Sequence, residues 1–466
     1  MSPEPAGRLA GAEEVTERAL AASKSQGCIV LVEDRFDANV RFAMNTTTTN
    51  GVKHDRSVTV VAISTRPDGS AVGVASRSGG GAVEDLVAAA EAAAAAAPVA
   101  EDAADLLTGG ADPDFGEGPG DTSLQIFTPV LSELEAAFGE ARGADRLLAG
   151  FAQHEVSTLY LASSGGMRRR HVQPTGSLEL VARSADGTRS SWAARGTPDF
   201  SDVSVLDLDA KLARRLEWSA RNIELDAGRY EVVLPPEAVA DLVIEIGWAM
   251  SGRDAEDGGN VFSRGGRGTA VGERLSALPF NLFSDPYYPG LECQPFLATG
   301  GSSADVSVFD NGAPLERVGY IEDGVLSRLN YHRAGAARSG TVFTPPVDNL
   351  ILDCPDGAGS VEDLVARTER GLLLTCLWYI REVDPATLLL TGLTRDGVYL
   401  VEGGEVVGAV NNFRFNESPL DLLSHALEVG TTTRSLSREW GEYANRTAMP
   451  PLRVADFNMS SVSPAS

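Results

Sequence analysis

The chain has 466 residues, of which 43% are apolar and 22% are charged, proportions typical of a globular protein rather than a disordered one. At about 150 residues per domain, this length allows roughly three domains or two large ones. The formal net charge of -26, from 65 Asp and Glu against 39 Lys and Arg, disfavours contact with the phosphate backbone of nucleic acids. We therefore expect a folded protein that does not bind nucleic acid.

The acidic residues are concentrated between Ser78 and Ala141, where 13 carboxylates occur without a Lys or Arg. This pattern favours a solvated acidic face over a docking surface. No window of about 18 apolar residues predicts a membrane span, and the N-terminal residues lack the basic and apolar regions of a signal peptide. We expect a cytoplasmic protein that does not bind a membrane.

Helical and strand patterns alternate along the first half of the chain. Four segments are expected to be helices, at about 8–25, 82–97, 128–142 and 208–222. Residues between them alternate in the manner of strands, with a hairpin turn predicted at Pro67-Asp68-Gly69. A run dense in Gly, Pro and Asp at about 108–121 predicts a boundary or a long loop. The expected N-terminal α+β domain covers residues 1–225, in subdomains at about 1–110 and 121–225.

The pattern changes after Tyr230. Pro235 and Pro236 begin a segment in which apolar residues recur at helical spacing, which predicts a helix buried on one face. Many short strands separated by Gly-rich turns follow. They predict a C-terminal domain over residues 226–466, rich in antiparallel strands that form a curved or barrel-like sheet. The fold class of the whole chain is therefore expected to be α+β.

Residues that bind metals are sparse. A hydrolytic zinc site needs about three protein ligands and an open position for water. The chain has five histidines, and no two are closer than 17 residues, which excludes a helical pair: His54, His154, His171, His332 and His425. His154-Glu155 is followed by a strand pattern, which favours a histidine at a strand edge over a metal ligand.

Other candidate groups for catalysis or binding are few. Arg168, Arg169 and Arg170, next to His171, can pair with a substrate carboxylate or a partner's acidic surface, although a solvated loop is favoured. Cys293 with His332 as its base is a conceivable nucleophile. The remaining cysteines lack C-x-x-C spacing and are expected to be buried free thiols: Cys28, Cys354 and Cys376. These residues by themselves do not indicate a free-standing hydrolase.

Three segments carry a resemblance to a known family: YEVVLPPEAVADLV at 230–243, VGYIEDGVLSRLNYHRAGAARSG at 318–340 and TGLTRDGVYLVEGGEVVGAV at 391–410. They resemble the TldD/PmbA family, whose peptidases pair a metal-bearing TldD subunit with a related TldE (PmbA) subunit. The resemblance covers most of the chain. In TldD the helix that follows the first segment carries His-Glu-x-x-x-His and a trailing acid, and a late Cys completes the metal site.

At the matching positions this chain has Ile244, Glu245, Ala249 and Asp254, and no cysteine follows Cys376. The resemblance therefore implies a TldE-like chain without catalytic residues, metal or cofactor of its own. Zinc or iron would be held by a TldD-like partner. Glu245 is then expected to act as an ion-pair or hydrogen-bond partner rather than as a catalytic base.

By this resemblance the chain is the non-metal subunit of a heterodimeric zinc metallopeptidase that cleaves unfolded peptides within an enclosed cavity. Exposed strand edges there would bind peptide backbone by β-augmentation. The candidate lining is the segment around Gly300, Gly301, Ser302 and Ser303, with an ordinary hairpin as the equal alternative. Two other functions remain open: a peptide-binding or scaffold protein outside proteolysis, and a partner subunit that matures a ribosomally made natural-product peptide.

Overall fold

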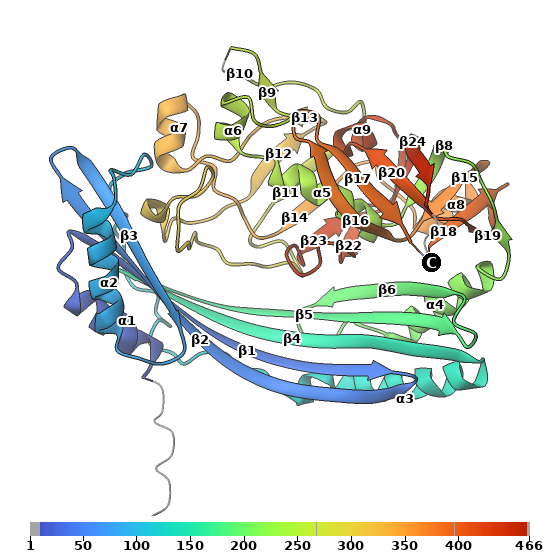
Figure 1. Cartoon of the computed structure of the whole chain (residues 1–466), viewed down its shortest axis with the longest axis horizontal. Helices are drawn as coiled ribbons and strands as arrows, with labels where there is room; N and C mark the ends of the chain where they lie inside the picture. The colour runs from blue at the N-terminus through green and yellow to red at the C-terminus, as the bar shows by residue number, and fades with distance from the viewer. Residues whose placement is uncertain (1–9, 267, 396, 464–466) are drawn as a thin grey trace, which may run out of the picture.

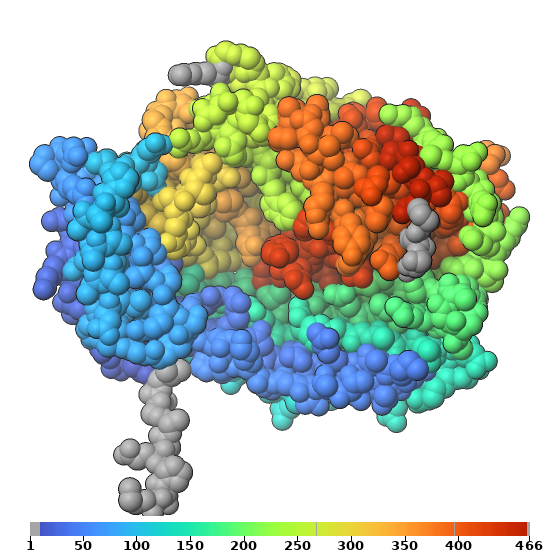
Figure 2. All heavy atoms as spheres, viewed as in Figure 1, coloured from blue at the N-terminus to red at the C-terminus, as the bar shows by residue number. Residues whose placement is uncertain are grey.

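The structure is a computed structural model that describes residues 10–266, 268–395 and 397–463. A long six-stranded antiparallel sheet forms one layer, and the C-terminal residues lie over one of its faces (Figure 1). In the space-filling view the two layers meet along most of the length of the sheet (Figure 2). The expected α+β fold class is confirmed. Within the described residues, no helix has the length and apolar character needed to cross a membrane.

The long sheet contains strands from both expected N-terminal subdomains. Its order is β3-β2-β1-β4-β5-β6, and β1 pairs with β4 from Ile29 opposite Ser163 to Phe42 opposite Gly150. The predicted hairpin connects β2 to β3. The strand bounds are β1 Gly27–Ala43, β2 Thr46–Arg66, β3 Gly69–Ser78, β4 Arg146–Ser163, β5 Arg168–Ser184 and β6 Ser190–Thr197.

Four helices of the N-terminal half accompany this sheet, close to the expected positions. They are α1 Ala12–Ala22, α2 Val83–Ala96, α3 Thr128–Gly143 and α4 Val205–Trp218. The last helix begins three residues before the expected start, because the Ser204 side chain caps it by accepting a hydrogen bond from the Asp207 backbone nitrogen at 3.2 Å. A short 3-10 turn, η1 Leu124–Phe127, precedes α3.

The two faces of β1 have different environments because side chains alternate along a strand. Even-numbered residues pack in the cores that include α1 and α2 at one end and α3 and α4 at the other. Odd-numbered Ile29 and Leu31 pack against Phe296, Val308 and Phe309 of the C-terminal half. Further along the same face, the odd-numbered residues are polar: Glu33, Arg35 and Asp37. This face is therefore apolar at one end and polar in the middle.

The C-terminal half contains two larger sheets and one two-stranded sheet. The ten-stranded sheet follows an open path, β16-β17-β20-β24-β8-β15-β18-β19-β7, with β21 paired to β24. Its strands are β7 Asn222–Ile223, β8 Gly228–Leu234, β15 Arg370–Leu374, β16 Leu377–Asp384, β17 Leu389–Thr394, β18 Val398–Glu402, β19 Glu405–Val410, β20 Phe413–Glu417, β21 Ala426–Val429 and β24 Leu452–Val462.

The second larger sheet has the order β13-β12-β11-β14-β23-β22. Its strands are β11 Asn281–Ser284, β12 Val318–Glu322, β13 Val325–Leu326, β14 Leu350–Asp353, β22 Thr433–Ser435 and β23 Thr447–Met449. The short hairpin is β9 Ser263–Arg264 and β10 Gly268–Thr269. The remaining helices are α5 Pro236–Trp248, α6 Gly252–Glu256, α7 Arg333–Ser339, α8 Val361–Ala366 and α9 Pro419–Ser424, with the 3-10 turn η2 Val308–Asp310.

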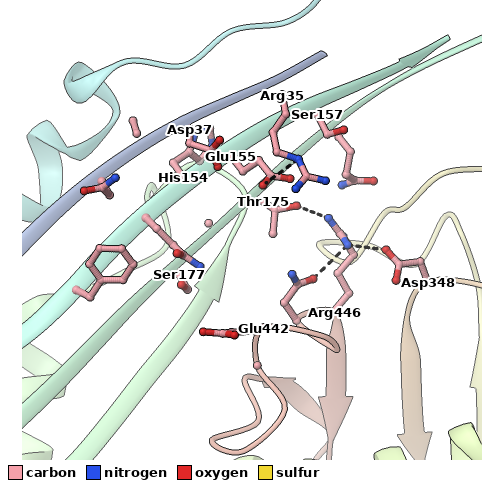
Figure 3. Close-up of a pocket in the computed structure, with 18 of the residues that line it drawn as sticks. Arg35, Asp37, His154, Glu155, Ser157, Thr175, Ser177, Asp348, Glu442 and Arg446 are labelled. Atoms are coloured by element: carbon pink, nitrogen blue, oxygen red, sulfur yellow. Dashed lines mark hydrogen bonds and ion pairs between the residues drawn. The ribbon is translucent and has the colours of Figure 1, made fainter. Parts of the chain in front are cut away.

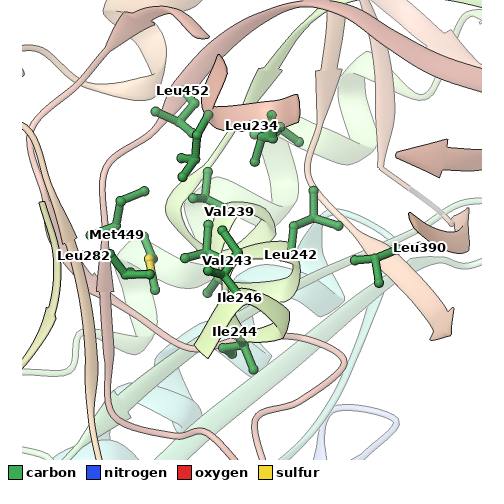
Figure 4. Packing of buried hydrophobic residues seen from close by; sticks show 14 of the residues in the cluster. Leu234, Val239, Leu242, Val243, Ile244, Ile246, Leu282, Leu390, Met449 and Leu452 are labelled. Carbon is green, nitrogen blue, oxygen red and sulfur yellow. The ribbon is translucent and has the colours of Figure 1, made fainter. Parts of the chain in front are cut away.

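Helix α5 forms the centre of the C-terminal core. Pro236 occupies its first turn, where a missing backbone N–H costs no helical hydrogen bond. Every residue from Ala238 to Ile246 is buried, so the helix is covered on all sides rather than on the one face expected from sequence. Residues from both larger sheets surround it (Figure 4): Leu234, Leu282, Leu390, Met449 and Leu452.

Candidate functional site

The four positions that match the TldD metal motif are divided between two helices. Helix α5 ends at Trp248, and Ala249 is its C-cap, with its backbone nitrogen bonded to the Glu245 oxygen at 3.1 Å. Asp254 is exposed on α6, which is capped by the Ser251 side chain. Only Ile244 and Glu245 therefore lie within the buried part of α5.

The side chain of Ile244 is 1% exposed and lies beside a pocket of about 200 Å³. In Figure 4 it points away from Leu234 and Leu452, on the far side of the helix from most of the core. Trp248, Tyr320, Asn330 and Leu350 line the same pocket. The position of the first motif histidine is thus occupied by an apolar side chain that faces a small pocket.

Two of the three carboxyl groups of α5, those of Asp241 and Glu245, are buried and disfavour ionisation. Burial raises the pKa of Glu245 to about 7, and the nearby Glu382 acts in the same direction. One turn earlier, burial also raises the pKa of Asp241 to about 7, although Asp241 accepts hydrogen bonds from Ser437 and from the Glu439 backbone nitrogen. These groups hold protons more tightly than usual at neutral pH.

The residues around α5 do not fit a zinc ion. Ile244 and Ala249 offer no donor atom, and zinc in proteins takes His, Cys or carboxylate ligands. Across the described ranges, no cluster of three or more His, Cys, Asp or Glu side chains is placed to hold a metal ion. We therefore derive no catalytic step through a metal held by this chain.

A polar cleft of about 460 Å³ lies between the long sheet and the C-terminal half (Figure 3). The odd-numbered residues of β1 form part of its wall, together with polar residues of β4 and β5. Arg35 pairs with Glu33 at 3.1 Å and with Glu155 at 3.4 Å. Ser157 also donates a hydrogen bond to Glu33 at 2.7 Å. Cross-strand contacts thus fix the side chains of this wall.

Arg446 joins the two walls of the cleft (Figure 3). Its guanidinium pairs with Asp348 at 2.7 Å, donates to Asn445 at 3.1 Å, and reaches Thr175 on β5. Asp348 and Arg446 line both the cleft and the pocket beside Ile244. The pocket therefore adjoins the cleft at this ion pair.

The cleft has more acidic than basic side chains. Arg35 and Arg446 are its basic residues, and its acidic residues are Glu33, Asp37, Glu155, Asp348 and Glu442. Asp37 lies directly opposite Glu155 in the β1–β4 pairing. Burial raises the pKa of Glu155 despite the nearby Arg35, and Asp37 raises it further. Polar or cationic groups of a ligand would complement this wall.

The predicted peptide-lining segment is neither a strand nor a hairpin. Gly300, Gly301, Ser302 and Ser303 form an exposed loop fixed by its own side chains. The Thr299 hydroxyl donates to the Gly301 oxygen at 2.6 Å, and the Ser302 hydroxyl accepts from the Val308 backbone nitrogen at 3.1 Å. β-Augmentation by a strand edge is therefore not available from these four residues.

This loop nevertheless borders an extension of the cleft. A Cβ atom at Gly300 would lie 3.3 Å from Thr59 of β2. Thr59 lines a hollow of about 270 Å³ that shares four residues with the main cleft: Glu33, Ser157, Gln173 and Gln294. The structure thus brings the loop near one end of the cleft.

His154 is not at a strand edge as expected. It lies on β4, an interior strand, and is buried. Its Nδ1 contacts the Thr122 hydroxyl at 2.7 Å and its Nε2 contacts the Pro198 oxygen at 2.8 Å. Burial lowers its pKa. Both ring nitrogens are therefore engaged within the protein.

The basic run is also not a solvated loop. Arg168, Arg169 and Arg170 begin β5, and each pairs with a carboxylate of the same chain. These carboxylates are Glu17, Asp112 and Asp114, at 2.5, 2.9 and 2.9 Å. His171 contacts Gln173 at 3.0 Å. Part of the acidic segment is therefore neutralised within the molecule.

The proposed cysteine nucleophile is unsuited to that role. Burial raises the pKa of Cys293 to about 12, which keeps the sulfur as a thiol at neutral pH. His332 caps α7, with its Nδ1 accepting a hydrogen bond from the Gly335 backbone nitrogen at 3.1 Å. All four cysteines are buried, as expected for Cys28, Cys354 and Cys376.

Two family models match the chain. Residues 227–461 match the PmbA/TldA metallopeptidase C-terminal domain, and residues 123–220 match the PmbA/TldA metallopeptidase central domain. The chain therefore belongs to the PmbA/TldD metallopeptidase family. Comparison with curated protein sequences gives no match.

Solved structures with similar folds cover nearly the whole chain. TldE from Thermococcus kodakarensis has 16% identity and a TM-score of 0.76, over 96% of this chain and 99% of its own. A Thermotoga maritima protein described as a proposed modulator of a DNA gyrase has 17% identity and a TM-score of 0.75, over 96% and 99%. A Bacteroides thetaiotaomicron protein so described has 15% identity and a TM-score of 0.74, over 97% and 98%. At these identities the likeness shows the shared fold.

Apart from His154 and Glu155, which line the cleft, the sequence interpretation missed the cleft residues. One signal was present in β1, where the odd-numbered positions change from apolar Ile29 and Leu31 to polar Glu33 and beyond, while the even-numbered Ala38 and Val40 stay apolar. A strand with one face covered throughout and the other polar in its middle indicates a partly open face. No local signal connects Arg446 to this face, because its partner Thr175 lies 271 residues away.

Proposed function

We propose that this chain is the non-metal, TldE-type subunit of a heterodimeric, cytoplasmic zinc metallopeptidase that cleaves unfolded peptides. One observation carries the proposal. The motif helix of a metallopeptidase family is retained as α5, yet the first ligand position is Ile244, which lines a pocket that adjoins a polar cleft. These features support a peptide-binding role for a chain whose residues at the ligand positions do not fit the metal.

In this proposal the cleft binds part of the substrate. An extended peptide has unpaired backbone amides and carbonyls, which the polar wall can satisfy through Gln173, Thr175 and Ser177. The carboxylates of the cleft favour basic or polar substrate side chains. The loop at Gly300–Ser303 would border the end of the bound peptide.

A TldD-like partner would hold the zinc, or iron in its place. Such a metal polarises the scissile carbonyl and activates water. This chain would orient the peptide and exclude bulk water from one side of it. Glu245 would take no part in proton transfer, because no metal ligand of this chain lies beside it.

A reconstitution assay tests the proposal. The chain, a metal-bearing TldD-like protein from the same organism, and an equimolar mixture of the two are each incubated with an unfolded peptide. Cleavage by the mixture alone, abolished by a chelator and restored by zinc, is the expected result. Cleavage by the chain alone in the presence of chelator would overturn the proposal.

The same assay separates the two alternatives. Cleavage of one particular peptide precursor and of no generic unfolded peptide would identify a natural-product maturation subunit. Peptide binding by the chain, with no cleavage in any mixture, would identify a binding or scaffold protein. Both alternatives are compatible with the same cleft. The range of peptides that the mixture cleaves, or the absence of any cleavage, therefore distinguishes them.

A further inference from the structure

A cavity of about 720 Å³ lies between helix α4 and the ten-stranded sheet. Its lining shares no residue with the polar cleft. Helix α4 lies at one end of the long sheet, next to the part of the C-terminal half that contains β18 and β19 (Figure 1). Sites for small molecules commonly have volumes of about 300–1,000 Å³ and often lie between domains. The cavity is therefore large enough for a small ligand held between the two halves of the chain.

One face of α4 forms a wall of this cavity. The helix residues that line it recur at helical spacing: Asp207, Ala210, Lys211, Arg214, Arg215 and Trp218. The opposite face of the helix packs in the core that includes α3, through Leu208, Leu212 and Leu216. The packing of that face therefore fixes the direction in which the cavity face points.

The wall opposite α4 is largely apolar. Val361 and Val365 of α8, Leu373 of β15 and Val406 of β19 line it. These residues form or cover the core between α8 and the ten-stranded sheet, and Trp218 packs against the same core. An apolar group that enters the cavity would be removed from water against these side chains, which is favourable.

Lys211 brings a positive charge that a ligand can reach. Its side chain is 40% exposed, and its ammonium donates one hydrogen bond, to Glu237 at 3.4 Å, of the three that it can make. Glu237 raises the pKa of Lys211, but burial and the nearby Arg215 and Arg195 together lower it below its usual value. A negatively charged group beside Lys211 would therefore offset a local excess of positive charge.

Arg214 supplies a second cation on the same wall. It is exposed, and among the described residues its guanidinium has no hydrogen-bond or ion-pair partner. Residues three apart on a helix have Cβ atoms roughly 5–6 Å apart, so one carboxylate can reach both Lys211 and Arg214. A carboxylate is also the group that a guanidinium binds with two parallel hydrogen bonds.

We propose that this cavity binds a small carboxylate that carries an apolar body. The carboxylate pairs with Lys211 and Arg214, and the body packs against Trp218, Leu373 and Val406. Free fatty acids and peptides with apolar C-terminal residues both have this chemistry. The inference does not rest on the proposed function, because the cavity is separate from the cleft in which substrate would bind.

Other ligand classes fit less well. The acidic residues of the lining are exposed, and they would repel a ligand with several negative charges more than one with a single charge: Asp207, Glu362 and Glu405. A cationic ligand would be repelled by Lys211 and Arg214. A neutral apolar ligand would cover the apolar wall but leave both cations without a partner.

Calorimetric titration of the isolated full chain, at a pH near 7.5 where carboxylates are ionised, tests the inference. The probes are octanoate, the neutral octanamide, and acetate, which lacks the apolar body. Octanoate is expected to bind about tenfold more tightly than octanamide, and acetate more weakly than both. Two further probes, Ac-Leu-Leu-Leu with a free C-terminal carboxylate and its C-terminal amide, distinguish the sources. Tighter binding of octanoate than of the peptide acid would indicate a fatty acid, and the reverse order would indicate a peptide C-terminus.

Two variants locate the binding in this cavity. Arg214→Gln should weaken octanoate binding roughly tenfold and leave octanamide binding nearly unchanged. Arg183→Gln is the matched control, because Arg183 is also exposed but does not line the cavity. Ala210→Trp narrows the cavity and should weaken octanoate and octanamide alike. Ala136→Trp is its control, since Ala136 is an exposed helix residue of α3 outside the cavity.

Equal binding of octanoate and octanamide to the native chain, together with equal binding of the two peptides, would overturn the inference. Octanoate binding that neither Arg214→Gln nor Ala210→Trp weakens would do the same. So would a loss of octanoate binding in Arg183→Gln as large as that in Arg214→Gln, since the effect of charge would then not depend on the cavity. None of these results bears on cleavage by the reconstituted complex, which tests the proposed function separately.

Discussion

Arg446 and Asp348 form an ion pair of 2.7 Å at the junction between the cleft and the pocket beside Ile244. The Arg446 side chain is 12% exposed and its guanidinium also reaches Thr175 of the long sheet, whereas the Asp348 side chain is 68% exposed. Arg446 therefore helps to hold the two layers together and also shapes the site.

Replacement of Arg446 should destabilise the protein. Arg446→Met keeps an apolar stem but removes the bonds to Asp348, Asn445 and Thr175, so unfolding free energy should fall by about 1–2 kcal/mol. Arg370→Met is the control, since Arg370 and Glu402 are exposed and 3.7 Å apart. The control should change stability by less than about 0.5 kcal/mol. Urea unfolding measures both, and equal effects would contradict the account.

Position 244 should tolerate an apolar residue but not a charge. Ile244→Asp places a carboxylate where Ile244 is 1% exposed, and stability should fall by roughly 2–4 kcal/mol. Ile244→Val removes one methyl group and should cost about 0.5–1.5 kcal/mol. Thermal unfolding followed by circular dichroism measures the difference. An aspartate tolerated as well as valine would mean that position 244 is open to water.

Glu245 should make stability depend on pH. Its pKa of about 7 in the folded protein lies above the usual value of about 4.3, so the folded state binds the proton more tightly. The contribution of protonated Glu245 to the free energy of unfolding is fully present below about pH 4, and it is lost as the pH rises through 7. Glu245→Gln should therefore stabilise the protein by roughly 1–3 kcal/mol at pH 8 and have little effect at pH 4.

Glu237 on the same helix provides a control of opposite sign. Burial alone would raise its pKa, but Lys211 at 3.4 Å and neighbouring arginines hold the pKa below its usual range. Its stabilising effect is therefore present above about pH 4.3 and lost as pH falls further. Glu237→Gln should destabilise the protein at pH 8. Denaturant unfolding at several pH values measures the stability of both variants. If Glu245→Gln and Glu237→Gln changed the free energy of unfolding in the same direction at pH 8, the opposite pKa shifts assigned to the two groups would be wrong.

Glu245→Gln should also leave peptide cleavage by the reconstituted complex within a few-fold of the native rate. Loss of a general base lowers rates by about 100-fold or more. A stable and fully assembled variant complex with a loss of that size would show that Glu245 takes part in catalysis.

The cysteines should be unreactive in the folded chain. All four are buried, and the pKa of Cys293 is about 12. Iodoacetamide at pH 8 should label less than one thiol per native chain and all four after denaturation, as counted by mass spectrometry. Rapid labelling of Cys293 in the native protein would contradict its assignment as an unreactive thiol and would support a role as a nucleophile.

Local patterns predicted the elements of the fold better than their surroundings. The Pro235-Pro236 start and the apolar spacing predicted α5, because both signals lie within the helix. The same pattern could not show that the helix is buried on all sides, since Leu282 and Leu390 come from strands that begin more than about 30 residues after the helix ends. The sequence of the helix itself therefore does not show that distant strands cover it.

Long-range pairing explains the errors at the site. Arg168 and Arg169 looked like solvated charges because Glu17 and Asp112 lie 151 and 57 residues away. His154 was expected at a strand edge because the local sequence does not show the order of strands in a sheet, and so does not show that β4 lies between β1 and β5. The loop near Gly300 resembled a hairpin, since Gly and Ser also suit turns that are fixed by side-chain hydrogen bonds.

The metal content of the purified proteins tests the central claim most directly. Elemental analysis is applied to the isolated chain and to its purified complex with the TldD-like partner, after exposure to zinc and removal of excess. We expect no stoichiometric metal in the isolated chain and one tightly held metal ion per heterodimer. Close to one metal ion bound tightly by the isolated chain would contradict the assignment of Ile244 and Ala249 as positions that bind no metal.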